Sequence, residues 1–127
     1  MDNLVPRSYE FYASIMRSVI DGEAHEFENI KQDVIQDMGI HHSALIPLLP
    51  SKRATVFDRR LEIALKDLKK GGYIEETSKR KYTITTEGKE LAADPEAVNS
   101  LNIRVELLMK ENERLGEKIR QIVGRNE

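Results

Sequence analysis

Residues 51–85 read SKRATVFDRRLEIALKDLKKGGYIEETSKRKYTIT, and the spacing of apolar side chains in the first half of this stretch predicts a helix. These side chains fall within about 100° of arc at about 100° per residue, as the buried face of an amphipathic helix does. They are Phe57, Leu61, Ala64, Leu65 and Leu68. Ser51 is placed to cap the N-terminus of the helix, and Gly71-Gly72 to end it.

The opposite face of this helix is mostly basic. It carries Thr55, Arg59, Lys66 and Lys70. After the two glycines, residues 73–76 and 81–85 have the composition of short strands, and residues 77–80 join them. We predict a β-hairpin with a basic tip, formed by Lys79, Arg80 and Lys81.

The first fifty residues predict two further helices. Pro6 followed by apolar residues at steps of three and four predicts a helix that ends near Asp21-Gly22. The same spacing from Phe27 to Met38 predicts a second helix, ended by Gly39 and preceded by a short strand at 24–26. Prolines break residues 40–50 into a loop or one short helical turn.

This order of elements predicts the fold class: mainly α with a small β-hairpin. Three helices followed by a hairpin, with a basic outer face on the third helix, is the order of a winged helix, a variant of the helix-turn-helix. We therefore predict a winged-helix domain at residues 1–93.

The distribution of charge points to a nucleic acid as the partner of this domain. The net charge is −2, but residues 51–81 hold 10 Lys and Arg against 5 Asp and Glu, while residues 1–50 hold 3 against 8. A charge run is usually only a solvated face. Here basic residues coincide on the outer face of the third helix, before that helix and at the hairpin tip, which favours binding to double-stranded DNA.

Within this interface we expect two kinds of contact. Phosphates should be bound by the residues before the third helix and at the hairpin tip, which are Ser51, Lys52, Arg53, Lys79, Arg80 and Lys81. Arg59 should read a base, because its guanidinium fork matches the two acceptors of guanine, and Thr55 could contact a thymine methyl group. Lys66 lies on the same face. Arg60, on the flank, could bind phosphate or pair with a carboxylate.

The sequence resembles the N-terminal winged-helix domain of Mrr-like restriction endonucleases over about residues 5–92. The residues that carry the resemblance are Leu49-Pro50-Ser51, Thr55-Val56-Phe57-Asp58, Arg60, Ala64, Leu68-Lys69-Lys70 and Gly72. Lys52 and Ile63 depart from the family pattern, which has glycine and tryptophan there. The resemblance implies the fold and DNA binding through the third helix and the wing. Because it does not extend to the nuclease half of the family, we expect no cleavage by this chain.

Residues 94–127 predict a long helix that forms a dimer. Asp94-Pro95-Glu96 has the cap, the proline and the acidic first turn of a helix start. The apolar side chains that follow form a heptad repeat, with Val98, Val105, Asn112 and Ile119 at a and Leu101, Leu108, Leu115 and Ile122 at d.

β-Branched residues at a with leucine at d favour a parallel two-stranded coiled coil, and one asparagine at a favours a single register. We therefore predict a homodimer joined along this seam. A helix that packs back on its own domain is the alternative.

Other functional classes find little support in the composition. The chain has no cysteine, which excludes disulfides and thiolate metal sites and suits the reducing cytoplasm. No apolar run approaches the roughly 20 residues of a membrane span. His41-His42 lack nearby partners for a metal, and Glu87-Gly88-Lys89 is too short a match to indicate a nuclease. We expect no metal, no cofactor and no catalytic residue.

The function predicted from the sequence is that of a dimeric, non-enzymatic DNA-binding protein, a transcriptional regulator. The alternative is an accessory or scaffold subunit of a restriction, defence or chromosome-handling complex, in which the coil binds a partner protein.

Overall fold

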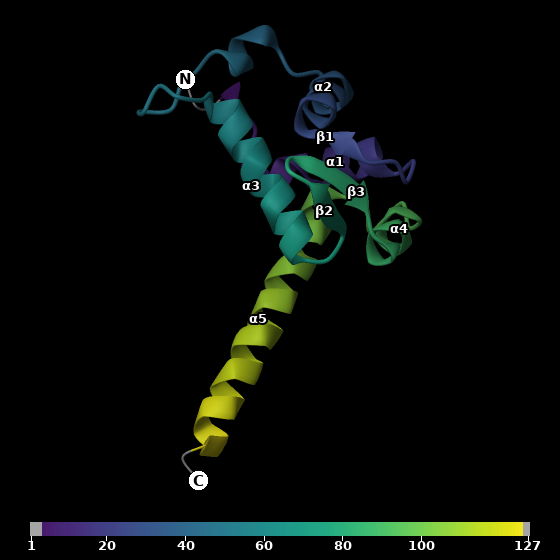
Figure 1. Cartoon of the computed structure of the whole chain (residues 1–127), viewed down its shortest axis with the longest axis vertical. Coiled ribbons are helices and arrows are strands. Elements are labelled where there is room, and N and C mark those ends of the chain that lie inside the picture. The colour runs from purple at the N-terminus through teal and green to yellow at the C-terminus, as the bar shows by residue number, and fades with distance from the viewer. Residues whose placement is uncertain (1–3, 126–127) are drawn as a thin grey trace.

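The computed structural model describes the backbone of residues 4–125 and the side chains of residues 4–118, 120 and 121. Its elements are, in chain order, η2 (Ser8–Phe11), α1 (Tyr12–Val19), β1 (His25–Glu26), α2 (Phe27–Met38), η3 (His42–Leu45), α3 (Val56–Lys70), β2 (Ile74–Ser78), β3 (Lys81–Ile84), α4 (Thr86–Ala92) and α5 (Ser100–Arg125). The structure is mainly helical with a small antiparallel sheet in the order β1-β3-β2, as the sequence predicts in outline. Figure 1 shows a body from which α5 extends as an arm.

The hydrophobic core lies between α1, α2, α3 and the sheet. Phe11 and Phe57 meet edge to face at its centre, with ring centroids 5.2 Å apart. All five apolar residues predicted for the buried face of the third helix are buried, which confirms the period of that helix. Gly39 ends α2 with φ of 62°, in the left-handed conformation that glycine adopts without strain.

The hairpin is tighter than the sequence predicts. Ile74 pairs with Ile84 at its base, and β2 continues to Ser78, with a bulge between Glu76 and Ser78. Two residues, 79 and 80, therefore make the whole turn. β1 pairs with β3 on the other side, as His25 with Tyr82, which ties the hairpin to the segment before α2.

The N-terminus of α3 differs from the prediction, because Thr55 rather than Ser51 caps the helix. The Thr55 hydroxyl accepts a hydrogen bond at 3.1 Å from a backbone amide in the first turn. Ser51 lies in a loop that backbone pairing closes, with the amide of Leu49 donating to the carbonyl of Ala54 at 3.0 Å. Serine and threonine are similar caps by local chemistry, and this pairing decides between them.

The start of α5 also differs from the prediction. Asp94 accepts hydrogen bonds only within a single turn, and the long helix begins at Ser100, where Asn99 accepts from the amide of Asn102 at 3.1 Å. Val98 therefore precedes the helix and packs against the core, so the seam begins at Leu101. The short helix α4 between the hairpin and this turn was not predicted.

The first turns of α5 belong to the same core as the body. Ile103 is fully buried, and Leu107 packs against the end of α3 so closely that a Cβ on Gly71 would collide with it. The hydroxyl of Ser100 accepts from the amide of Ala13 at 3.1 Å and donates to a carbonyl of η2. The division expected at residue 93 thus separates elements that share one core.

We expect Ile103→Ala to lower the free energy of unfolding by about 2–5 kcal/mol, because it leaves a cavity where a buried side chain was. Glu106→Ala is the matched control, since Glu106 is exposed on the same helix, and it should change stability by less than about 0.5 kcal/mol. Urea unfolding at one fixed protein concentration measures both. Equal, small effects of the two substitutions would show that α5 is not part of the core.

Candidate nucleic-acid interface

The outer face of α3 presents three exposed cations, Arg59, Lys66 and Lys70, of which Lys70 pairs with Glu111 of α5 at 3.6 Å. Arg59 and Lys66 lie nearly two turns apart, about 100–180° around the helix from the buried leucines. Arg59 has one long ion pair, to Glu62 at 3.9 Å, and the described side chains include no ion-pair partner for Lys66. This face is therefore open to solvent and positively charged, as the sequence predicts.

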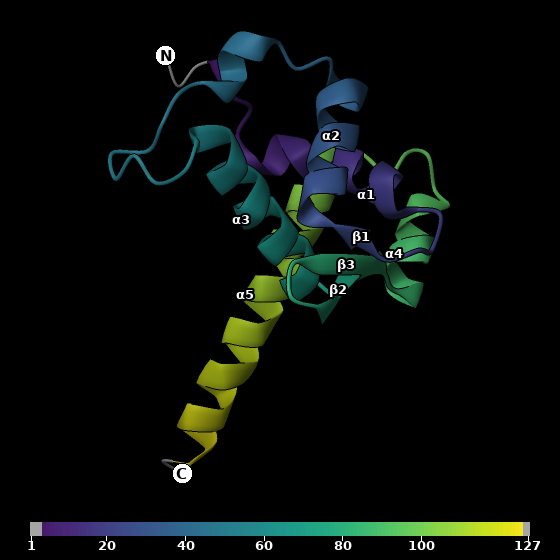
Figure 2. The ribbon, with the colours of Figure 1, turned by 45° about the horizontal axis from the view of Figure 1, so that its top comes forward.

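The loop before α3 carries the predicted phosphate contacts Ser51, Lys52 and Arg53, all of them exposed. Figure 2 shows this loop projecting away from the body beyond the N-terminal end of α3. Lys52 has φ of 60°, and the hydrogen bond from its amide to the carbonyl of Leu49 is 2.8 Å long. The loop is a closed turn with two cations at its tip, rather than the first turn of the helix.

The hairpin turn separates two residues that the sequence treats alike. Lys79 is exposed, and its ammonium group forms no ion pair with any side chain in the described part of the chain. The guanidinium of Arg80 lies 4.2 Å from the ring centroid of Phe27 and 3.1 Å from a carboxylate oxygen of Glu62. Arg80 therefore joins the hairpin to α2 and α3, whereas Lys79 is open to solvent. Lys81 is half-buried within β3.

Two other predicted contacts serve the fold. The hydroxyl of Thr55 caps α3, so its oxygen is already used. Arg60 is half-buried and donates to the carbonyl of Val5 at 2.9 Å, which holds the N-terminal segment against α3. Of the two roles that the sequence leaves open for Arg60, the structural one fits this geometry.

Glu62 and Glu76 have positioning roles that the sequence reasoning did not identify. Glu76 accepts hydrogen bonds from the backbone amide of Arg80 at 2.8 Å and from Lys69 at 3.0 Å. These bonds, the one from the amide first, hold the pKa of the Glu76 carboxyl below its usual value. Glu62, on α3, pairs with the guanidinium of Arg80 in the hairpin turn. The sequence does show acidic residues one turn from basic residues on α3. This spacing does not reveal that an acidic residue of α3 pairs with a residue of the hairpin.

A second exposed surface runs along α5. Ile103 faces the body, and the seam positions 105, 108 and 112 point roughly 140–200° away from it at about 100° per residue. The apolar side chains of the seam are accordingly exposed: Leu101 61%, Val105 53%, Leu108 56% and Leu115 47%. Ile119 and Ile122 lie in α5, but their side chains are outside the described part. The apolar seam is thus left uncovered by its own body.

The described residues offer no group of three or more histidine and acidic side chains that could hold a metal ion. His41 accepts a hydrogen bond from the amide of Ser43 at 3.1 Å and so caps η3. Glu87 lies in α4 and pairs with Lys110 of α5. Within residues 4–125, no helix combines the length and the apolar composition that a membrane span requires.

Comparison with known proteins gives one match. The family model described as Mrr N-terminal domain matches residues 9–94, which is more than half of the chain. No curated protein and no solved structure matches the sequence. The matched residues include α3, the loop before it and the hairpin, whereas α5 lies outside them. The resemblance stated from the sequence is confirmed.

We expect Arg80→Ala to lower the free energy of unfolding by about 1 kcal/mol, the sum of a partly exposed cation–π contact and a surface ion pair. Lys79→Ala, at the neighbouring residue of the same turn, should change it by less than about 0.5 kcal/mol. Urea unfolding followed by circular dichroism compares the two. A larger loss for Lys79→Ala would mean that the inward and outward roles are assigned to the wrong residues.

Proposed function

We propose that this chain, which belongs to the Mrr N-terminal domain family, binds double-stranded DNA with α3 in the major groove. Membership suggests a restriction-system-related domain, and the order of helices and hairpin supports a winged helix. The observation that carries the proposal is the pair of exposed cations Arg59 and Lys66 on the outer face of α3, flanked by Lys52-Arg53 and Lys79.

The dimensions of these elements suit a duplex. α3 has 15 residues and is about 22 Å long at 1.5 Å per residue, and the major groove admits one helix. With α3 in the groove, the loop at its N-terminal end and the hairpin beside it would each face a strand of the backbone. Lys52, Arg53 and Lys79 then bind phosphates and set the position of the protein.

Arg59 is the residue proposed to read a base. Its one carboxylate neighbour, Glu62, already has a closer partner in Arg80 at 3.1 Å, against 3.9 Å to Arg59. The guanidinium of Arg59 can therefore leave this contact at small cost and bind the two acceptors of a guanine. Arg80, which holds Glu62 in place, supports the reading residue instead of contacting DNA itself.

We further propose that two copies associate in parallel along the seam of α5. The seam is apolar and exposed from Leu101 to Leu115, and Asn112 at its centre would favour one register through an amide pair. Since each body packs on the opposite face of its own α5, the two bodies would lie on either side of the coil. Such a dimer presents two copies of α3 and would favour a pseudo-palindromic site.

The role that follows is that of a non-catalytic regulator of transcription. A scaffold subunit that binds a different protein through α5 is the second candidate, and one feature of α5 favours it. In a parallel homodimer Arg104 and Glu111 at g would face Met109 and Gly116 at e, so these positions form no ion pairs between copies. A partner with other residues at e could supply them.

The first prediction from this proposal concerns DNA specificity. Arg59→Ala should cost roughly 1–3 kcal/mol per half-site on the preferred sequence and relax the choice at one base pair. Lys79→Ala should weaken binding to all duplexes alike and lower the salt slope by about 0.9 for each phosphate that is no longer neutralised. Lys89→Ala, an exposed cation of α4, is the control and should change neither property.

Selection of binding sites from random duplexes by each variant distinguishes these roles. If Arg59→Ala selects the unchanged site, or Lys79→Ala a changed one, the proposed division between base and phosphate contacts is wrong.

The second prediction concerns the oligomeric state. The full chain should sediment as a dimer, and the double variant Leu101→Glu, Val105→Glu should sediment as a monomer, because it places charges in the apolar seam. Both side chains are exposed in the single chain, so the fold should persist by circular dichroism. Gln121→Glu, at position c outside the seam, should remain a dimer. A dimer that survives the double substitution would place the interface elsewhere.

A further inference from the structure

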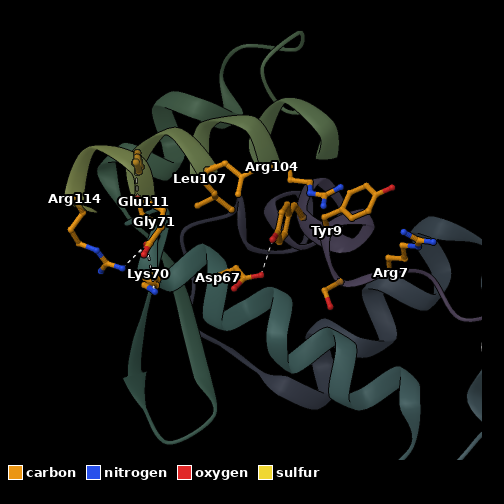
Figure 3. Close-up of a pocket in the computed structure, with 13 residues that line it drawn as sticks. Arg7, Tyr9, Asp67, Lys70, Gly71, Arg104, Leu107, Glu111 and Arg114 are labelled. Atoms are coloured by element: carbon orange, nitrogen blue, oxygen red, sulfur yellow. Dashed lines mark hydrogen bonds and ion pairs between the residues drawn. The ribbon is translucent and has the colours of Figure 1, made fainter. Parts of the chain in front are cut away.

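A cavity of about 630 Å³ lies where the N-terminal segment, the end of α3 and α5 meet. Figure 3 shows Arg104 and Leu107 on α5, Asp67 and Lys70 at α3, and Tyr9 on the N-terminal segment around it. This volume falls within the range of about 300–1,000 Å³ that small-molecule sites occupy. The cations proposed to contact DNA do not line it, so the cavity is separate from the interface described above.

The lining carries an excess of positive charge. Its cations outnumber its carboxylates by five to two, and they are Arg7, Lys70, Arg104, Lys110 and Arg114. The two carboxylates already have partners. Asp67 accepts from the hydroxyl of Tyr12 at 2.7 Å, and Glu111 pairs with Arg114 and, at 3.6 Å, with Lys70.

Two of the five cations are left without a carboxylate. Neither Arg7 nor Arg104 forms an ion pair with any described side chain. Both lie on the Tyr9 side of the cavity, with Tyr9 between them in Figure 3. The positive charge of this end is thus available to an anion.

The same end of the cavity offers apolar surface. The guanidinium of Arg104 lies 4.3 Å from the ring centroid of Tyr9, which fixes its orientation, and the ring of Tyr12 and the side chain of Leu107 line the wall beside it. Burial, and then the bond to Asp67, raise the pKa of the Tyr12 hydroxyl far above its usual value, so this group stays a proton donor. Oriented cations beside aromatic and aliphatic walls are suited to a flat, charged molecule.

We propose that this cavity binds a small planar anion, an aromatic or heteroaromatic ring that carries a carboxylate or a phosphate group. Arg7 and Arg104 bind the anionic group, and Tyr9, Tyr12 and Leu107 contact the ring. Because the bound molecule touches η2, α1 and α5 at once, it stabilises the attachment of α5 to the body.

The test is a calorimetric titration of the full chain with four probes: benzoate, adenosine 5′-monophosphate, inorganic phosphate and uncharged adenosine. At least one of the two aromatic anions should bind, at least tenfold more tightly than phosphate and adenosine, and should raise the melting temperature. If only one of the two binds, the result identifies the class of ligand, an aromatic carboxylate or a nucleotide phosphate. Arg104→Gln and Arg7→Gln should each weaken binding about tenfold or more, because each removes a charge-assisted hydrogen bond. Lys89→Gln, outside the cavity, is the matched control.

Three results with the full chain and its arginine variants would overturn the proposal. They are no binding of either aromatic anion at millimolar concentration, binding that both arginine variants leave unchanged, and binding of inorganic phosphate as tight as that of the aromatic anions. A titration that succeeds only with the Leu101→Glu, Val105→Glu variant would also overturn it, since the partner chain would then occupy the cavity. None of these outcomes depends on DNA. The ligand site can therefore be disproved while DNA binding is upheld, and DNA binding can be disproved while the ligand site is upheld.

Discussion

The burial of Ile103 is the contact that gives this molecule its shape. It draws the first turns of α5 into the core, where Leu107 meets Gly71 at the end of α3. An amphipathic helix has two faces, and fixing one of them fixes the direction of the other. Once Ile103 faces the body, the leucine and valine seam must face away from it. The arm is therefore oriented by the core and not by a flexible linker.

A second set of contacts fixes the hairpin against α3. Arg80 lies over Phe27 and pairs with Glu62, while Glu76 receives hydrogen bonds from the Arg80 amide and from Lys69. These contacts use cations that composition alone would count toward DNA binding. The exposed cations outside these contacts include those on the loop, on the outer face of α3 and at residue 79. Some of the basic residues, such as Arg80 and Lys69, therefore hold the hairpin against α3, and the others are exposed on the surface that this arrangement creates.

Much of the fold follows from local sequence patterns. The buried face of α3, the glycine that ends α2 and the hairpin after Gly71-Gly72 all rest on side-chain period and glycine conformation, which act within a few residues. Where the prediction was wrong, the deciding contact or element is one that the period of the apolar side chains does not reveal. Ser51 and Thr55 are similar caps, and the loop closure from Leu49 to Ala54 selects Thr55. α4 has only seven residues, too few for an apolar period to be recognised.

The residues of the candidate site show the same division. The exposure of Arg59 follows from its place opposite the buried face and was predictable. The inward turn of Arg80 depends on Phe27 and Glu62, which lie 53 and 18 positions earlier in the chain, and no local pattern brings them together.

If the exposed cations form a DNA-binding surface, the most direct test is the affinity of the full chain for a random-sequence duplex at several salt concentrations. Roughly six phosphate contacts, three from each of two protomers, predict that log affinity falls with log salt at a slope of about −5. Binding at low salt with a slope of this size is the expected result. No binding at low salt, or an affinity that salt leaves unchanged, would contradict DNA binding by this surface and favour the scaffold role.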